Sequence, residues 1–158
     1  MNYSLRTGFS FGITSGVITT LGLMVGLHSG THSKLAVVGG ILTIAIADAF
    51  SDALGIHISE EAKDKQPQRQ IWLATTSTFL TKLVFALTFI VPVLMFELLT
   101  AMIVSVIWGL LVISIFSFMI AKVQKVDPRR MVLEHLVIAL IVIVITHFTG
   151  EWIALKFS

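Results

Sequence analysis

Long apolar runs fill most of the chain, and short polar stretches separate them. Four of these runs, at 35–58, 71–95, 98–121 and 131–155, each reach the length of about 20 residues that a helix needs to cross a bilayer. A fifth run at 9–28 carries several Ser and Thr side chains but no charge. The pattern predicts an all-α membrane protein with five transmembrane helices.

The connectors are too short to fold as a separate soluble unit, so residues 1–158 are expected to form a single transmembrane domain. Residues 9–28 are too long and too polar for a cleaved signal peptide, and we expect them in the mature protein. Asp127-Pro128 is typical of a helix start, and Pro92 predicts a kink near the end of the third span.

Composition agrees with a membrane location, and the placement of charge predicts an orientation. Only 13% of the residues are charged, against about a quarter in soluble domains. Lys34 and Lys156 lie on one side of the predicted membrane. Most other basic residues fall at the N-terminus or in the second and fourth connectors: Arg6, Lys63, Lys65, Arg69, Lys122, Lys125, Arg129 and Arg130. The positive-inside rule therefore predicts a cytoplasmic N-terminus and an outside C-terminus. We expect the protein to lie in the cell membrane if it is prokaryotic and in an organelle membrane if it is eukaryotic.

Glycines recur at every fourth position of the first span and form small-residue ridges, which let helix backbones approach closely. The ridge residues expected to pack against another helix are Gly12, Gly16, Gly22 and Gly26. Two partners fit the ridges: a second copy of the chain, giving a homodimer through span 1, or span 2 of the same chain.

The second span contains two acids one helical turn apart, Asp48 and Asp52. Acids inside a membrane are costly and usually face a partner or a hydrated path. Counting from the cytoplasmic ends at about 1.5 Å per residue, Asp48 lies at the depth of Lys82 in the third span, and Asp52 at the depth of Ser15. We expect Lys82 to be the charge partner of Asp48, or a built-in counter-ion for an empty site.

Asp52 has no cation at its own depth, so we expect it either to be neutral or to line a hydrated path. A carboxylate that exchanges a proton for a cation suits coupled transport. Oxygen ligands such as Asp48, Asp52 and Ser15 suit hard or borderline divalent metal ions. The alternative is a neutral acid that is hydrogen-bonded inside the bundle.

Two further groups carry possible metal ligands. His57 and Glu61 continue the second helix at i, i+4 spacing and could attract cations at the cytoplasmic mouth, or form a solvated helix end. Two more i, i+4 pairs lie near the opposite surface and could form an outer metal site if spans 1 and 5 touch: His28 with His32, and His147 with Glu151.

The sequence contains no phosphate-binding glycine loop, no His-Glu-x-x-His and no nucleophile elbow, so we do not expect an enzyme, a permanently bound cofactor or a nucleic-acid partner. The expected partners are the lipid bilayer, metal ions and protons. The chain has no Cys, which excludes disulfides and thiolate ligands.

Two segments together carry a family resemblance. Residues 12–23 (GITSGVITTLGL) and 46–55 (IADAFSDALG) resemble the first- and second-span motifs of the vacuolar iron transporter (VIT) family. Residues 91–94 (VPVL) are similar to a third-span motif of that family. In these motifs Ser15 replaces an aspartate, Asp52 a methionine and Ile56 a glutamate. The family's cytoplasmic metal-binding insert between spans 2 and 3 is missing, so the chain resembles a short member of the family.

The resemblance implies a dimer that moves Fe²⁺ or Mn²⁺ out of the cytoplasm in exchange for protons, along a path between spans 1 and 2. Asp52 would act as metal ligand and proton exchanger. Two alternatives remain: a membrane scaffold or subunit in which the acids and Lys82 form a structural network, or a transporter of another small solute, with Lys82 attracting an anion.

Overall fold

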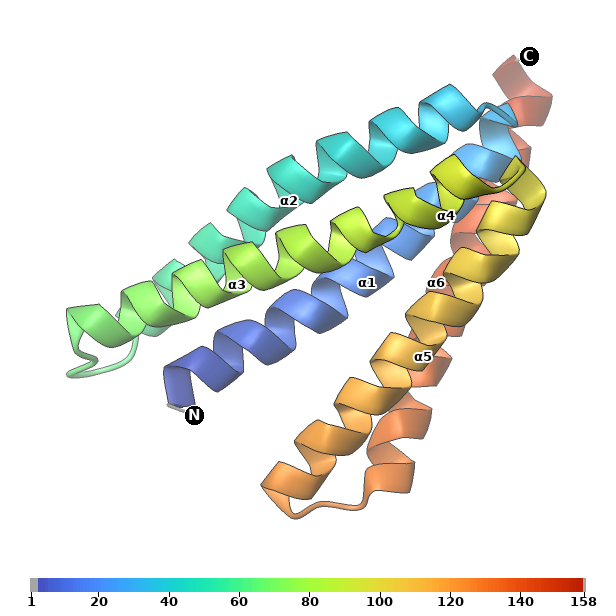
Figure 1. The fold of residues 1–158 in the computed structure, drawn as a ribbon. Coiled ribbons are helices and arrows are strands. Elements are labelled where there is room, and N and C mark those ends of the chain that lie inside the picture. The colour runs from blue at the N-terminus through green and yellow to red at the C-terminus, as the bar shows by residue number, and fades with distance from the viewer. Residues whose placement is uncertain (1–2, 158) are drawn as a thin grey trace.

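The computed structural model describes residues 3–157, which form helices joined by short turns (Figure 1). In chain order the helices are α1 (Tyr3–Thr31), α2 (Lys34–Glu61), α3 (Gln68–Thr88), α4 (Ile90–Met95), α5 (Leu98–Gln124) and α6 (Pro128–Phe157). Within residues 3–157, five segments are long and apolar enough to cross a membrane, with α3 and α4 counted as one. The chain is an all-helical integral membrane protein, as its apolar runs predict. Its orientation stays a prediction.

The third span is broken at Phe89, between α3 and α4. Pro92 has no N–H to donate to the carbonyl of Thr88, and its ring crowds that carbonyl. The Phe89 N–H instead donates to Ala86 O at 3.2 Å, which tightens the last turn of α3. The kink predicted from Pro92 is therefore confirmed, and it lies one turn before the proline.

Local capping explains where the other helices begin and end. The backbone N–H of Arg129 donates to Asp127 Oδ1 at 3.0 Å, which confirms the predicted start of α6. Ser33 Oγ accepts from the Ala36 N–H at the start of α2. Lys125 adopts a left-handed backbone with φ of 58° and ends α5, so the chain turns back into α6.

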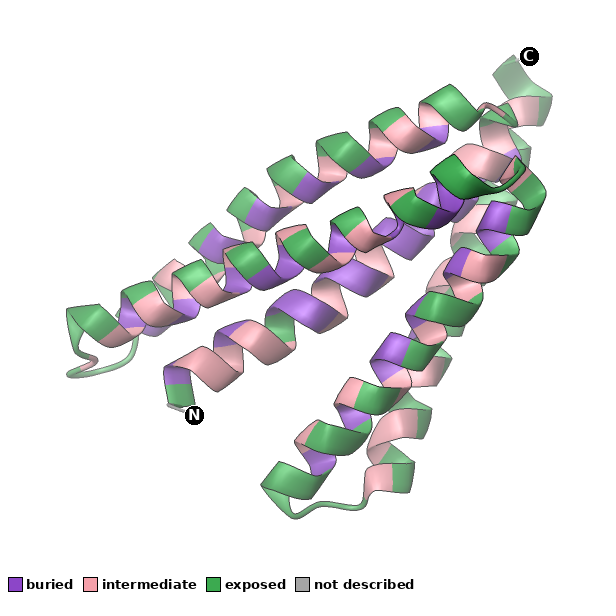
Figure 2. Ribbon diagram, viewed as in Figure 1, coloured by how far each residue is buried: buried purple, intermediate pink, exposed green. Residues whose placement is uncertain are grey.

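The first helix is the centre of the bundle, since α1 packs against α2, α3, α5 and α6. The core is built on one stripe of α1, comprising Ile13, Val17, Leu21 and Met24, with further apolar side chains from the surrounding helices. Figure 2 shows the contrast between α1, where buried residues are frequent, and the outer helices, which expose much of their surface. The exposed surface is rich in Leu, Ile, Val and Phe, as lipid contact requires.

The first glycine ridge of α1 packs against α3. A Cβ at Gly12 would lie 2.8 Å from Thr78 O, and a Cβ at Gly16 would lie 3.1 Å from Lys82 O. The expected packing of this ridge against span 2 is wrong, because the ridge faces the third span. Two parallel backbones approach here, and larger side chains would hold them apart.

The second ridge packs against α6. A Cβ at Gly22 would lie 2.9 Å from Val142 Cγ1, and one at Gly30 would lie 3.2 Å from Gly150 O. A Cβ at Gly26 would lie 3.4 Å from Thr146 O. Both ridges are thus filled within one chain, so the glycines no longer argue for a homodimer through span 1, and that dimer stays a prediction.

The helices diverge toward one end of the bundle. At that end α1 begins and the α2–α3 and α5–α6 turns lie, and the α5–α6 pair points away from α1, α2 and α3 (Figure 1). We call it the basic end, because the two turns, the helix ends that adjoin them and the first turns of α1 together carry most of the Lys and Arg residues. A cleft of about 480 Å³ opens there between α1, α5 and α6.

The glycine packing predicts a difference between two Gly→Ala changes. Gly12→Ala should lower the free energy of unfolding by about 1–3 kcal/mol, because its Cβ would meet the α3 backbone. Gly39→Ala is the matched control, since nothing lies within 4 Å of its Cβ and alanine favours a helix. Thermal unfolding of both variants in the same detergent measures this; equal melting temperatures would contradict the observed packing.

Candidate functional site

Lys82 lies at the middle of α3 and is fully buried, with a relative exposure of 0%. Gly16 of α1 makes room for it, since a Cβ at Gly16 would lie 3.2 Å from Lys82 Cγ. A buried ammonium is costly unless opposite charges and hydrogen-bond acceptors surround it. The arrangement of this part of the bundle therefore depends on what the Lys82 amine contacts.

Lys82 Nζ contacts both acids of the second span. It lies 2.5 Å from Asp48 Oδ2, which it meets as an ion pair without a hydrogen bond, and it donates a hydrogen bond to Asp52 Oδ2. Both carboxylates can reach one amine because residues four apart lie on the same face of a helix. Lys82 therefore ties α3 to two successive turns of α2.

Ser15 brings α1 into the same cluster. Lys82 Nζ donates to Ser15 Oγ at 2.8 Å, and Ser15 Oγ donates to Asp52 Oδ2 at 2.5 Å. The ammonium thus lies among three oxygen atoms, one each from Asp48, Asp52 and Ser15, and donates hydrogen bonds to those of Asp52 and Ser15. We call these four residues the Lys82 cluster.

The expected Asp48–Lys82 and Asp52–Ser15 contacts are both present, but they form one site rather than two. The expectation that Asp52 has no cation partner is wrong. Counting by depth compares backbone positions, whereas the long Lys side chain carries its amine about one helical turn from its own Cα. Lys82 therefore reaches acids at two depths.

The cluster holds two carboxylates and one ammonium, and no other ion pair among residues 3–157 involves them. With all three groups ionised, the cluster carries one excess negative charge. The Lys82 side chain is 1% exposed, whereas the Asp48 and Asp52 side chains are 25% and 21% exposed. The negative groups are thus accessible from outside the chain and the positive group is not.

His57 and Glu61 lie at the α2 end near the α2–α3 turn. His57 Nε2 lies 3.4 Å from Glu61 Oε1, and its Nδ1 lies 2.9 Å from Thr75 Oγ1 of α3. The His57 ring also packs against Trp72, with ring centroids 4.7 Å apart. The contacts of His57 hold α2 against α3 at this end. The predicted role of His57 and Glu61 in attracting cations stays a prediction.

The four residues considered for an outer metal site lie where α1 meets α6. His147 Nε2 lies 3.3 Å from Glu151 Oε1, and the His28 and His32 rings have centroids 5.6 Å apart. Ser29, which the sequence did not single out, lies 2.6 Å from His147 Nδ1. Spans 1 and 5, formed by α1 and α6, do touch here. The side-chain hydrogen bond that links them joins Ser29 to His147.

Within residues 3–157, no three His, Cys, Asp or Glu side chains converge as metal ligands. This applies to the outer residues and to His57 with Glu61. The Lys82 cluster offers two carboxylates, a hydroxyl and an amine, which is a mixed set of oxygen and nitrogen donors.

No protein-family model matches the chain, and no curated protein matches its sequence. The resemblance to the VIT family therefore stays an expectation carried by the two quoted segments.

The cluster predicts how stability responds to removing charge. Lys82→Met should lower the free energy of unfolding by about 3 to 5 kcal/mol, because it leaves two partly buried acids inside the apolar bundle without a cation. Adding Asp48→Asn and Asp52→Asn to that variant should recover most of the loss. Thermal unfolding of the single and triple variants measures the coupling. A triple variant no more stable than Lys82→Met would contradict a shared ion pair.

Proposed function

We propose that this protein is a proton-coupled transporter of divalent metal ions, with Fe²⁺ or Mn²⁺ as substrate and the Lys82 cluster as its exchange site. The observation that supports this is the unequal charge of the cluster. Two carboxylates share one ammonium within apolar helices, and an excess charge there calls for a proton or a cation.

The charges balance for an exchange of two protons against one divalent ion. In the empty state Lys82 is protonated and one of the two acids also carries a proton, so the cluster is neutral. In the loaded state both acids are ionised, the Lys82 amine is neutral, and the metal ion supplies two positive charges. Each state avoids a net charge inside the membrane.

The donors of the cluster suit this class of substrate. Carboxylate and hydroxyl oxygens bind hard and borderline divalent ions, and a neutral amine nitrogen adds preference for transition metals over Ca²⁺. The partly exposed carboxylates of Asp48 and Asp52 are the groups that an incoming ion meets first. When the substrate is absent, the protonated Lys82 side chain occupies the site and supplies its positive charge.

A structural role for the cluster is the competing interpretation. The Lys82 ammonium donates to Asp52 and Ser15, and Ser15 both accepts and donates, which is also what a static polar network requires. In that case the protein would be a membrane scaffold or subunit, and no ion would enter the cluster. Anion transport is disfavoured, because two acids already neutralise Lys82.

Transport and scaffold functions differ in a flux measurement. Purified protein in proteoliposomes should take up Mn²⁺ when an outward-directed proton gradient is imposed, with two protons moved per Mn²⁺. Asp52→Asn removes one exchangeable proton and one ligand, and should reduce the initial uptake rate at least tenfold. An Mn²⁺-sensitive dye inside the vesicles and a pH dye measure both fluxes.

The matched control is Asp64→Asn, which removes an acid from the exposed α2–α3 turn outside the cluster and should leave uptake unchanged. If wild-type vesicles show no Mn²⁺ or Fe²⁺ flux above empty vesicles, or if Asp52→Asn transports as well as wild type, the transport proposal fails and the scaffold interpretation stands.

A further inference from the structure

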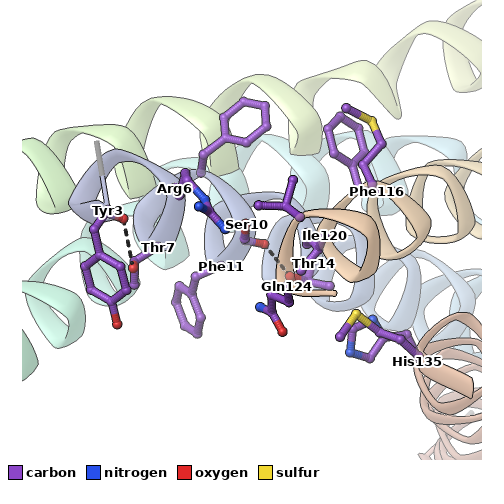
Figure 3. Close-up of a pocket in the computed structure, with 14 residues that line it drawn as sticks. Tyr3, Arg6, Thr7, Ser10, Phe11, Thr14, Phe116, Ile120, Gln124 and His135 are labelled. Atoms are coloured by element: carbon purple, nitrogen blue, oxygen red, sulfur yellow. Dashed lines mark hydrogen bonds between the residues drawn. The ribbon is translucent and has the colours of Figure 1, made fainter. Parts of the chain in front are cut away.

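The cleft at the basic end is bounded by the first half of α1, the last turns of α5 and the start of α6. Figure 3 shows its labelled side chains, with Arg6, Ser10 and Thr14 on α1 and His135 on α6. Its volume of about 480 Å³ lies within the range of small-ligand sites, about 300–1,000 Å³. None of the Lys82 cluster residues lines it.

The cleft is positively charged. Arg6 lines it and forms no ion pair with any other residue in the range 3–157, and the described lining contains no Asp or Glu. The polar side chains around Arg6 are hydroxyl, amide and imidazole groups, including Ser10, Gln124 and His135. Nearby residues add basic charge, with Lys122 near the end of α5, Lys125 in the α5–α6 turn and Arg129 at the start of α6. Arg130 beside them is paired with Glu134 at 2.8 Å.

The inner part of the cleft is apolar. Phe116 of α5 packs edge-on against Phe9 of α1 and Phe85 of α3, with ring centroids 5.7 Å and 5.6 Å apart. Met119 and Ile120 continue this wall along α5. Because α1 begins at this end, Arg6 lies nearer the helix end than Phe9 does, so the charge is outermost and the hydrocarbon surface is deeper.

We propose that this cleft binds an anionic phospholipid, with its phosphate at Arg6 and an acyl chain along Phe9, Phe116 and Ile120. A phospholipid in the adjoining leaflet presents the same order of chemistry, a negative head group followed by hydrocarbon. Basic pockets between transmembrane helices are sites where acidic lipid head groups bind. Guanidinium groups pair with phosphate oxygens in a two-pronged geometry.

A free anion and a second copy of the chain are the other occupants that this surface admits. Neither matches both of its parts. A free phosphate uses Arg6 but leaves the aromatic wall empty. A second copy presents a helical surface rich in Leu and Ile, and Glu134, the acid of α6 at this end, is already paired with Arg130.

Lipid titration of the purified full-length protein tests the proposal. Native mass spectrometry in a neutral detergent should show phosphatidylglycerol binding about fivefold more tightly than phosphatidylcholine of the same acyl chains. Arg6→Gln should abolish that preference and Arg6→Lys should retain most of it. Lys156→Gln, which removes an exposed charge at the opposite end of α6, should leave the preference unchanged.

Three results would overturn the proposal. Equal binding of the two lipids by wild type does so even if Arg6→Gln fails to fold. Displacement of the bound lipid by inorganic phosphate at comparable concentration would assign the site to a free anion. A dimer in lipid-free detergent that Arg6→Gln converts to a monomer would assign the cleft to a second copy. None of these readouts requires transport activity.

Discussion

A single buried ammonium shared by two carboxylates organises this bundle. Lys82 contacts Asp48 and Asp52 on α2 and Ser15 on α1, so one side chain sets the relative positions of three helices. A buried charge is tolerated only with such partners, and it penalises any sliding of one helix along another. In an apolar bundle that lipid surrounds, few other interactions specify position so strongly, because a Leu contacts lipid as favourably as it contacts another Leu.

The packing of α1 makes that contact possible. Its first glycine ridge brings the α3 backbone close enough for Lys82 to reach across to Ser15, and its second ridge holds α6 at the other end. One helix is thus shared by two groups, α2 with α3 on one side and α5 with α6 on the other. Ser15 belongs to the Lys82 cluster, whereas Thr14 lines the cleft at the basic end. Neighbouring residues of α1 therefore belong to the two sites that the structure presents.

The sequence predicts the fold well for physical reasons that are local. Apolar runs of membrane length define five spans, Asp127-Pro128 predicts the start of α6, and Pro92 predicts the break in the third span. Depth counting brings Asp48 to Lys82 and Asp52 to Ser15, because helical rise is regular. It misses that Lys82 also reaches Asp52, since side-chain length and direction do not follow from backbone depth.

The partners of the glycine ridges also could not be predicted from the sequence. The glycine spacing shows that one face of the helix lacks side chains, but it does not show which helix packs against that face. Spans that are neighbours in the sequence need not be the closest in space. The same holds for Ser29 at His147 and Thr75 at His57. Each is one of several hydroxyl residues in its span, and the rotation of the helix about its axis decides which of them contacts the histidine.

Infrared difference spectroscopy on adding Mn²⁺ to the purified protein addresses the exchange site itself. If the ion enters the Lys82 cluster, metal addition should shift the carboxylate stretching bands and remove a protonated-carboxyl band, and Asp52→Asn should abolish both changes. A metal-induced spectrum that is the same in wild type and Asp52→Asn, or no spectrum at all, would contradict the assignment of ion exchange to this cluster.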